Sequence, residues 1–366
     1  MGKQSSQIMR ILTALLFVFM STLAVQAYDF ESNGIYYNIL SSKDKTVEVT
    51  RAANKRYSGD IIIPTTVNLN GKELSVVAIG DEAFGWCSEL TSITFGDSVK
   101  RIGHYAFTLC NKLKNLTLGS NINIIGKSAF EKCYGLTRIE IPSNIETIGS
   151  CAFWDCDNVK EIIIHNGVKI IGPKAFYNNN KVTNIFIPTS VEEIGSGAFY
   201  DCDNLKVLKI EDSEKELILD SSYPWSYHKL DQFYLGRTPK DSFEGWGEIT
   251  AKEIIIGSHV NRLRWRVCIN LETITLLGTT PPESKEFTEE QYATVKVNVP
   301  QEAIPAYQAT EPWNKFWSLP NSITQAEVSN DEVEAVYTLN GKCYSSADKG
   351  VLILKMKSGK TKKVVK

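Results

Sequence analysis

Carboxylate and amide side chains recur in the middle of the chain at a spacing that could bind a cation. The blocks repeat every 23 residues and comprise Asp155 and Asp157, Asn178 and Asn180, and Asp201 and Asp203. If each block has the same place in a repeating coil, oxygen ligands from neighbouring coils would face one another and could hold Ca²⁺. Asp and Asn also cap turns by hydrogen bonding to the nearby backbone, and we favour that interpretation over calcium binding.

Eight cysteines offer thiol chemistry, but five of them follow the same 23-residue spacing. These five are Cys87, Cys110, Cys133, Cys156 and Cys202. Stacked at one position of successive coils, their Cβ atoms would lie about 4.8 Å apart, beyond the roughly 3.8 Å of a disulfide. We therefore predict a buried ladder of free thiols. Cys151 falls at a variable position and is predicted to be exposed, and the pairing of Cys151, Cys268 and Cys343 stays open.

Other motifs for catalysis or cofactor binding are incomplete. Gly126-Lys127-Ser128 matches the end of a phosphate-binding loop, but Asn121 stands where that loop requires a glycine. The chain has no Cys-x-x-Cys pair, so the sequence does not predict a zinc site. The chain also lacks Gly-x-Ser-x-Gly and His-Glu-x-x-His, and it has only four histidines. The sequence therefore predicts no catalytic residue and no cofactor.

The chemistry-bearing residues above belong to a 23-residue repeat. Its clearest members are the phenylalanines of six Ala-Phe pairs: Phe84, Phe107, Phe130, Phe153, Phe176 and Phe199. An Ile-Gly pair begins five residues before each of them, and an L-x-x-L-x-L-like pattern follows. That period and pattern are typical of leucine-rich repeat solenoids. Alternating apolar residues predict one short strand per coil, and stacking is needed because a single coil cannot bury its own apolar set. The glycine is expected to take a backbone shape that a Cβ would oppose.

The first segment of the chain has the layout of an export signal. Residues 1–27 contain basic residues, then an apolar run, then small residues at Val25 and Ala27. This order predicts a secretory signal peptide with cleavage before Tyr28. An uncleaved membrane anchor is the alternative, but the apolar run is short for a bilayer span. No transmembrane segment is predicted after cleavage.

The rest of the chain divides by pattern into a mainly β solenoid with short helical or irregular segments and β caps at both ends. Residues 28–78 alternate apolar and polar side chains around turns, which predicts an N-terminal β cap. Residues 79–215 hold the six regular repeats, and 216–320 hold irregular repeats and an aromatic C-terminal cap. Residues 331–366 form a small C-terminal β unit.

Specific repeat motifs point to a known family. The pattern I-G-x-x-A-F-x-x-C-x-x-L-x-x-I-x-I runs through Ile79–Phe95 and, with Val159 for Leu, through Ile148–Ile164. It resembles the BspA-like leucine-rich repeat family of secreted bacterial surface proteins, over about residues 28–318. The resemblance implies adhesion to host glycoproteins, matrix proteins or other cells.

The end of the chain carries a second resemblance. Val336-Tyr, Leu339-Asn-Gly-Lys342, Lys349-Gly350 and Lys362-Lys-Val-Val365 are similar to the short C-terminal sorting domains of Bacteroidetes-type outer-membrane secretion. Val351-Leu352 stands where an aromatic residue is usual. A plain β module is therefore the alternative to a sorting domain.

The outward positions of the predicted strands offer a surface for a partner. The candidate binding residues are Arg138, Glu140, Glu161, Ile163, Asn184, Phe186 and Lys209. Ile163 and Phe186 would be adjacent apolar anchors in a polar sheet face, unless they are only tolerated strand formers. Aromatic residues are dense in 223–246 and could stack on sugar rings, but we favour a role in the core of irregular coils.

Charge and composition narrow the class of function. Forty basic and 42 acidic side chains give a net charge of −2, which argues against nucleic-acid binding because that needs excess cations. We predict a secreted or cell-surface, non-enzymatic scaffold that binds a protein or glycoprotein. The alternatives are polysaccharide capture or a glycan-active protein, whose paired acids would lie in a cleft, and a purely structural component of the envelope.

Overall fold

The computed structural model describes residues 28–52, 55–220, 229–240, 248–263 and 267–318, and the backbone of three strands between 333 and 365. The predicted signal peptide and Cys343 lie outside the described residues, as does the Cys268 side chain. So do Tyr223, Trp225, Tyr227, Phe243 and Trp246. The chain divides into two compact units, Met1–Leu271 with Pro282–Lys285, and Glu272–Pro281 with Glu286–Lys366.

The first unit begins with two tight hairpins. Strands β1 (Phe30–Ser32), β2 (Ile35–Ser41) and β3 (Thr46–Thr50) pair antiparallel, as do β5 (Thr66–Leu69) and β6 (Lys72–Ile79). Asn33-Gly34 and Asn70-Gly71 form the two-residue turns, and all four residues have positive φ. Asn-Gly favours this geometry because it allows both central residues to be left-handed. β3 pairs in parallel with β6, so these strands cover one end of the solenoid's first ladder.

Each regular coil carries two short strands, not the single strand that the sequence predicts. The first ladder continues from β6 through β8 (Arg101–Ile102), β10 (Ile124–Ile125), β12 (Thr147–Ile148), β14 (Ile170–Ile171), β16 (Glu193–Ile194) and β18 (Ile218–Leu219). Its strands contain the isoleucine of the Ile-Gly motif. The extra strand arises because these isoleucines pair in parallel with their counterparts one coil away, as Ile125 does with Ile102 and Ile148.

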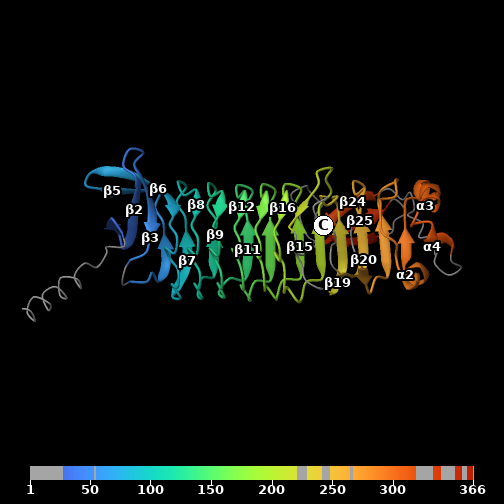
Figure 1. Ribbon diagram of the computed structural model, residues 1–366. Coiled ribbons are helices and arrows are strands. Elements are labelled where there is room, and N and C mark those ends of the chain that lie inside the picture. The colour runs from blue at the N-terminus through green and yellow to red at the C-terminus, as the bar shows by residue number, and fades with distance from the viewer. Residues whose placement is uncertain are drawn as a thin grey trace, which may run out of the picture. The chain divides into compact units, whose positions relative to one another are not determined.

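The second set of strands comes from the alternating apolar pattern, as predicted. It comprises β4 (Gly59–Ile62), β7 (Leu90–Thr94), β9 (Asn115–Thr117), β11 (Arg138–Ile141), β13 (Glu161–Ile164), β15 (Asn184–Ile187), β17 (Val207–Ile210), β19 (Lys229–Leu235) and β20 (Glu248–Ile256). β21 (Val267–Ile269) pairs with β20. The pairing is parallel throughout, and Figure 1 shows the successive coils of this unit side by side. This stacked β architecture confirms the predicted solenoid.

A column of stacked phenylalanine rings forms the core of the regular coils. Phe107 lies between Phe84 and Phe130, with ring centroids 4.9 and 5.0 Å apart and ring planes within 4° of parallel. The same stacking continues to Phe199, and all six rings are fully buried. The period of 23 residues therefore places equivalent side chains in contact across neighbouring coils.

The glycine of the Ile-Gly motif is needed for close stacking of the coils. A Cβ on Gly126 would lie 2.6 Å from the carbonyl carbon of Gly103, and one on Gly149 would lie 2.6 Å from that of Gly126. Neither glycine has a left-handed φ, so what opposes a Cβ there is the neighbouring coil and not the glycine's own backbone conformation. The left-handed positions of this coil are instead Ser128 and Lys132, with φ of 51° and 58°.

A buried arginine holds the start of the irregular coils. Arg237 has no solvent exposure, and its guanidinium donates to the carbonyl oxygens of Val191 at 2.6 Å and of Thr189 and Pro188 at 3.3 Å. Burial lowers the pKa of Arg237, and the nearby Glu211 opposes that shift. The cation thus donates to three backbone carbonyls, of which that of Pro188 also accepts from the backbone N–H of Val191.

The second unit is built around aromatic side chains. Its elements are β22 (Thr273–Leu276), α2 (Glu289–Thr294), β23 (Lys296–Asn298), the 3₁₀ turn η1 (Gln301–Ala303), α3 (Ile304–Ala309) and α4 (Lys315–Ser318). Tyr307, Trp313 and Phe316 are buried, whereas Trp317 is half-buried. Phe287 and Tyr292 complete the cluster, with rings within 5.8 Å of each other.

Three further strands lie near the end of the chain. β24 (Val333–Thr338), β25 (Val351–Met356) and β26 (Thr361–Val365) form an antiparallel sheet. These strands lie within the unit predicted at residues 331–366, whose bounds stay a prediction. Among the residues that the structure describes, no helix is long and apolar enough to cross a membrane.

Candidate binding surface

The second set of strands presents alternate side chains to solvent along successive coils. In β11 and β13, Ile139 and Ile162 face the core while Arg138 and Glu161 are exposed. Parallel pairing sets Arg138 beside Glu161 and Glu140 beside Ile163. Because pairing fixes the register, side chains of equivalent positions form rows that cross the coils.

A charged cluster of Arg138, Glu140, Glu161 and His165 lies on β11, β13 and the residue after β13. Arg138 contacts Glu140 at 3.1 Å and Glu161 at 3.2 Å, and His165 Nε2 lies 2.9 Å from Glu140. The hydrogen bond from His165, assisted by the charge of Arg138, lowers the pKa of Glu140 although partial burial opposes this. The cluster therefore carries two carboxylates for one permanent cation.

An apolar row begins beside this cluster and continues across the next coils. Phe186 pairs with Lys209, Lys209 with Tyr234, and Tyr234 with Ile255, all in the sheet formed by β15, β17, β19 and β20. Ile163 has the equivalent position one coil earlier, and its strand β13 contacts β15. All five side chains are half-buried, so each presents part of its surface to solvent. We call Ile163, Phe186, Lys209, Tyr234 and Ile255 the apolar row.

The aromatic ring within the apolar row is held by its neighbours. The ammonium of Lys209 lies 4.7 Å from the centroid of the Tyr234 ring, and the Tyr234 hydroxyl donates to Asp212. Burial, together with that carboxylate, raises the pKa of Tyr234. A ring fixed by a cation and a hydrogen bond loses little conformational freedom when a partner binds.

The structure brings most of the sequence-predicted residues together. Arg138, Glu140 and Glu161 belong to the charged cluster, and Ile163, Phe186 and Lys209 belong to the apolar row. Asn184 is exposed at the start of β15, where its amide donates to Thr183 Oγ1 at 3.2 Å.

Sequence reasoning missed three residues of this surface. Tyr234 lies 25 residues after Lys209, so a fixed period of 23 misses it. Ile255 lies a further 21 residues on, beyond the six regular strands that the prediction covered. Tyr234 was instead expected to fill the core. The alternation in Phe233-Tyr-Leu235, where Phe233 and Leu235 are buried, is the signal that could have placed it outward. His165 gave no signal, because it lies after the strand.

The Asp and Asn rows form a hydrogen-bonded ladder. Asn178 donates to Asp155 at 2.7 Å, Asn180 donates to Asn178 at 2.7 Å, and Tyr134 donates to Asp155 at 3.1 Å. Asp155, Asn178 and Asp201 also have left-handed φ, so they occupy the coil's turns. Among the residues described, no three His, Cys, Asp or Glu side chains are grouped closely enough to hold a metal ion. The Asp and Asn side chains thus bond to one another at the turns of the coils.

The cysteine column is a ladder of buried free thiols, as predicted. The Sγ of Cys110 donates to the carbonyl oxygen of Phe84 at 3.2 Å, and that of Cys133 donates to Phe107 at 3.1 Å. Cys156 and Cys202 make the same contact one and three coils further on. These four thiols thus donate to a buried carbonyl of the preceding coil, whereas the thiol of Cys87 contacts the carbonyl oxygen of Gly85 in its own coil.

The prediction that Cys151 is exposed is wrong, because its side chain is buried. It shares a column with Tyr105, Ser128 and Lys174, and all four have left-handed φ. The short side chains of Cys151 and Ser128 are buried, whereas the long side chains of Tyr105 and Lys174 reach solvent. Side-chain length therefore decides exposure at this position.

Comparison with known proteins shows which family the regular coils are similar to. Residues 77–206 match the model of the BspA type leucine rich repeat region in six copies. That match is shorter than the resemblance expected from the sequence, because it leaves out both ends. No curated protein matches the chain.

Several solved structures of bacterial proteins are similar to this chain. A leucine-rich repeat protein from Bacteroides ovatus is 21% identical over 76% of this chain and 80% of its own, with a TM-score of 0.47. The leucine rich repeat protein of T. pallidum is 26% identical over 53% and 86%, with a TM-score of 0.45. A leucine rich cell surface protein from Faecalibacterium prausnitzii is 18% identical over 75% and 89%, also with a TM-score of 0.45.

The six Phe-centred coils, with their Ile-Gly and Cys columns, coincide with the six matched copies. Residues 77–206 are thus similar to the BspA type leucine rich repeat region.

Proposed function

We propose that this protein is an exported, non-enzymatic scaffold that binds a protein or glycoprotein of a host or of another cell through its strand face. The observation that carries the proposal is the apolar row, in which half-buried side chains from successive coils are held in register. Exposed apolar residues within a polar surface are typical of interaction sites.

The apolar row has the composition of a binding anchor. Phe186 and Tyr234 supply ring surface, and Tyr and other aromatic residues carry much of the binding energy in protein interfaces. Lys209 separates the two rings and covers one of them. The backbone ladder on both sides fixes these groups before any partner arrives, which reduces the entropy that binding costs.

The charged cluster favours one charge and one orientation of the partner on the same surface. It carries two carboxylates for one permanent cation, so it favours a partner that presents basic groups next to an apolar patch. Exposed charges of this kind contribute more to association rate and orientation than to affinity. Partner binding should therefore weaken with salt mainly through slower association.

A pull-down on an array of host matrix proteins and mucin glycans tests the proposal. The double variant Phe186→Ala/Tyr234→Ala should lose at least about tenfold in affinity for the captured ligand, because it removes the two rings. Ile124→Ala/Ile170→Ala is the matched control, since both isoleucines are exposed but lie on the first ladder. Equal capture by the two double variants would refute a role for the strand face.

Polysaccharide capture is a second candidate, supported by an aromatic edge on the turns of the coils. Trp154, Tyr177 and Tyr200 are half-buried, with centroids 5.6 and 6.2 Å apart. Lys132 and Lys174 lie over the Trp154 ring at 5.6 and 6.0 Å. Aromatic rings beside cations favour an acidic polysaccharide, and hyaluronan or alginate binding that Trp154→Ala abolishes would support it. Binding that is unchanged in Trp154→Ala would refute this edge as the site.

The proposal of export depends on residues 1–27, which precede the described residues. Residues 1–27 direct secretion, and the strands at 333–365 belong to a sorting module at the C-terminus. Expression of the full chain in a Bacteroides host, followed by mass spectrometry of the surface fraction, tests both. A mature N-terminus at Tyr28 would support the signal peptide. Retention inside the cell of truncated chains that lack residues 331–366 would support sorting. Full-length protein in the cytoplasm would contradict export.

A further inference from the structure

The strand face has an uncovered edge at its N-terminal end. β4 is the outer strand of the sheet β4-β7-β9, and no strand in the described part of the chain pairs with its other side. The first ladder differs, because β3 pairs with β6 there and β2 and β1 follow. An exposed edge invites pairing with another chain, and proteins usually cover it.

The backbone of β4 has hydrogen-bonding groups that point away from β7. Gly59 donates to Glu89 at 2.9 Å and Ile63 donates to Thr94 at 2.8 Å, so these alternate residues face β7. In a parallel ladder each residue bonds on one side only, and its neighbours along the strand bond on the other. The N–H and C=O groups of Asp60 and Ile62 are therefore available for an additional strand.

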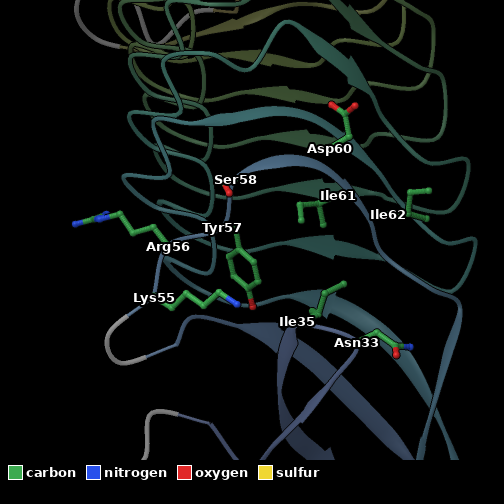
Figure 2. Close-up of a pocket in the computed structure, with 10 residues that line it drawn as sticks. Asn33, Ile35, Lys55, Arg56, Tyr57, Ser58, Asp60, Ile61 and Ile62 are labelled. Carbon is green, nitrogen blue, oxygen red and sulfur yellow. The ribbon is translucent and has the colours of Figure 1, made fainter.

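A pocket of about 400 Å³ lies along this edge. Figure 2 shows Ile61 and Ile62 of β4 on one side and Ile35 and Asn33, from the start of β2 and its turn, on the other. Ile62 is 72% exposed, which is a high value for a large apolar side chain. A pocket of this size can take a few residues of a peptide.

Two cations stand at the same pocket. Arg56 donates to the carbonyl oxygen of Gly85 at 3.1 Å, and in Figure 2 it extends away from Ile61 and Ile62. Lys55 forms no ion pair with any residue that the structure describes, and it points toward Tyr57. The carboxylate of Asp60 accepts hydrogen bonds from Thr91 and Ser92 of β7 at 2.6 Å each, and among the residues described it forms no ion pair with Lys55 or Arg56.

We propose that this edge binds an extended acidic peptide segment of a partner protein by strand addition. The peptide backbone pairs with Asp60 and Ile62, its apolar side chains contact Ile35 and Ile61, and a carboxylate pairs with Lys55. The two-residue repeat of the free backbone groups matches a strand and not a sugar chain. The site is separate from the apolar row, so the two can bind different parts of one partner or two partners.

Fluorescent hexapeptides of alternating valine and threonine, ending in Glu, Gln or Lys, test the ligand class by anisotropy with the full chain. The Glu peptide should bind about two- to fivefold more tightly than the Gln peptide, and the Lys peptide should bind least. The preference should vanish in Lys55→Gln. Equal binding of the three peptides, or none at millimolar concentration, would overturn the proposal.

Backbone pairing is tested by a proline at the free edge. Ile62→Pro removes an outward N–H without touching the bonds to β7, and proline is tolerated on edge strands. It should reduce binding of the Glu peptide about tenfold, whereas Ile62→Ala should reduce it less, because the N–H stays. Leu40→Ala is the control, since Leu40 is 48% exposed on β2 outside the pocket.

Two further outcomes separate the proposal from its rivals. Two peptides are N-methylated, one at the odd-numbered amides and one at the even-numbered amides. Methylation of the amides that face β4 should abolish binding, and methylation of the other set should leave binding intact. Equal effects of the two sets would exclude strand addition. Sedimentation of the chain alone should show a monomer; a dimer that Ile62→Pro dissociates would mean that a second copy occupies the edge. Unchanged melting of each variant confirms that it is folded.

Discussion

The amide of Asn179 donates to the carbonyl oxygens of Phe153 and Phe176, at 3.0 and 2.7 Å. Asn179 stands in the column that holds cysteine in the other regular coils. In four of these coils the thiol donates to the phenylalanine carbonyl of the coil before. The amide therefore replaces the thiol as a donor. This relationship explains why a polar residue is tolerated with no solvent exposure in the core.

Removing the donor at Asn179 should destabilise the solenoid. Asn179→Ala leaves the buried carbonyl of Phe153 without the amide donor, whereas the carbonyl of Phe176 still accepts from Cys202. The lost donor should cost about 1–3 kcal/mol in the free energy of unfolding. Asn179→Cys should lose less, because it restores the donor of the neighbouring coils and removes the Oδ1 that is buried without a partner. Urea unfolding followed by circular dichroism measures both, and equal losses would contradict the ladder.

A methyl group at the Ile-Gly glycine should separate neighbouring coils. A Cβ on Gly126 would lie 2.6 Å from backbone atoms of Gly103, so Gly126→Ala should cost about 1–3 kcal/mol. Gly119→Ala is the matched control, because its nearest contact would be the Phe95 Cβ at 3.4 Å. Thermal melting compares the two variants; a stable Gly126→Ala would show that the coils can move apart without cost.

The thiol ladder should resist alkylation in the folded protein. Burial raises the pKa of Cys156 and of Cys202 to about 12, and it also raises the pKa of Cys110 and Cys133. Only the thiolate reacts, so these four should stay unlabelled by iodoacetamide at pH 8 and react fully in denaturant. Peptide mapping identifies the labelled sites. Rapid native labelling of Cys133 would contradict its burial.

The charged cluster should make the stability of the folded protein depend on pH in the acidic range. The His165 hydrogen bond and Arg138 lower the pKa of Glu140. Since the folded-state pKa is below the unfolded value of about 4.3, the contribution of Glu140 to stability is present above that pH. It is lost as the pH falls through the folded-state pKa. In a carboxyl NMR titration His165→Ala should raise the pKa of Glu140, and no change would contradict the contact.

The regular coils could be predicted because each position of the 23-residue repeat has the same packing environment in every coil and therefore holds similar residues. The stacking of Phe107 on Phe130 and the burial of Cys133 follow from a fixed period and a shared core. Two features could not be read in this way. The second strand of each coil depends on backbone pairing of isoleucines such as Ile125, and Tyr234 lies 25 residues after Lys209, where the period changes.

The N-terminal edge shows a different limit of the sequence. The alternation in 28–78 indicates strands but not their partners, and only the register of β3 with β6 shows which ladder they cover. That choice leaves β4 open. Side-chain patterns indicate which face is buried, whereas an open edge is a property of backbone pairing between distant segments.

The most direct measurement of the central claim is photo-crosslinking from the strand face. p-Benzoylphenylalanine replaces either Phe186 in the apolar row or Ile170, which is 38% exposed on the first ladder. With a ligand captured from the matrix and mucin array, we expect crosslinks from position 186 and none from position 170. Crosslinks from position 170 alone would contradict binding through the strand face.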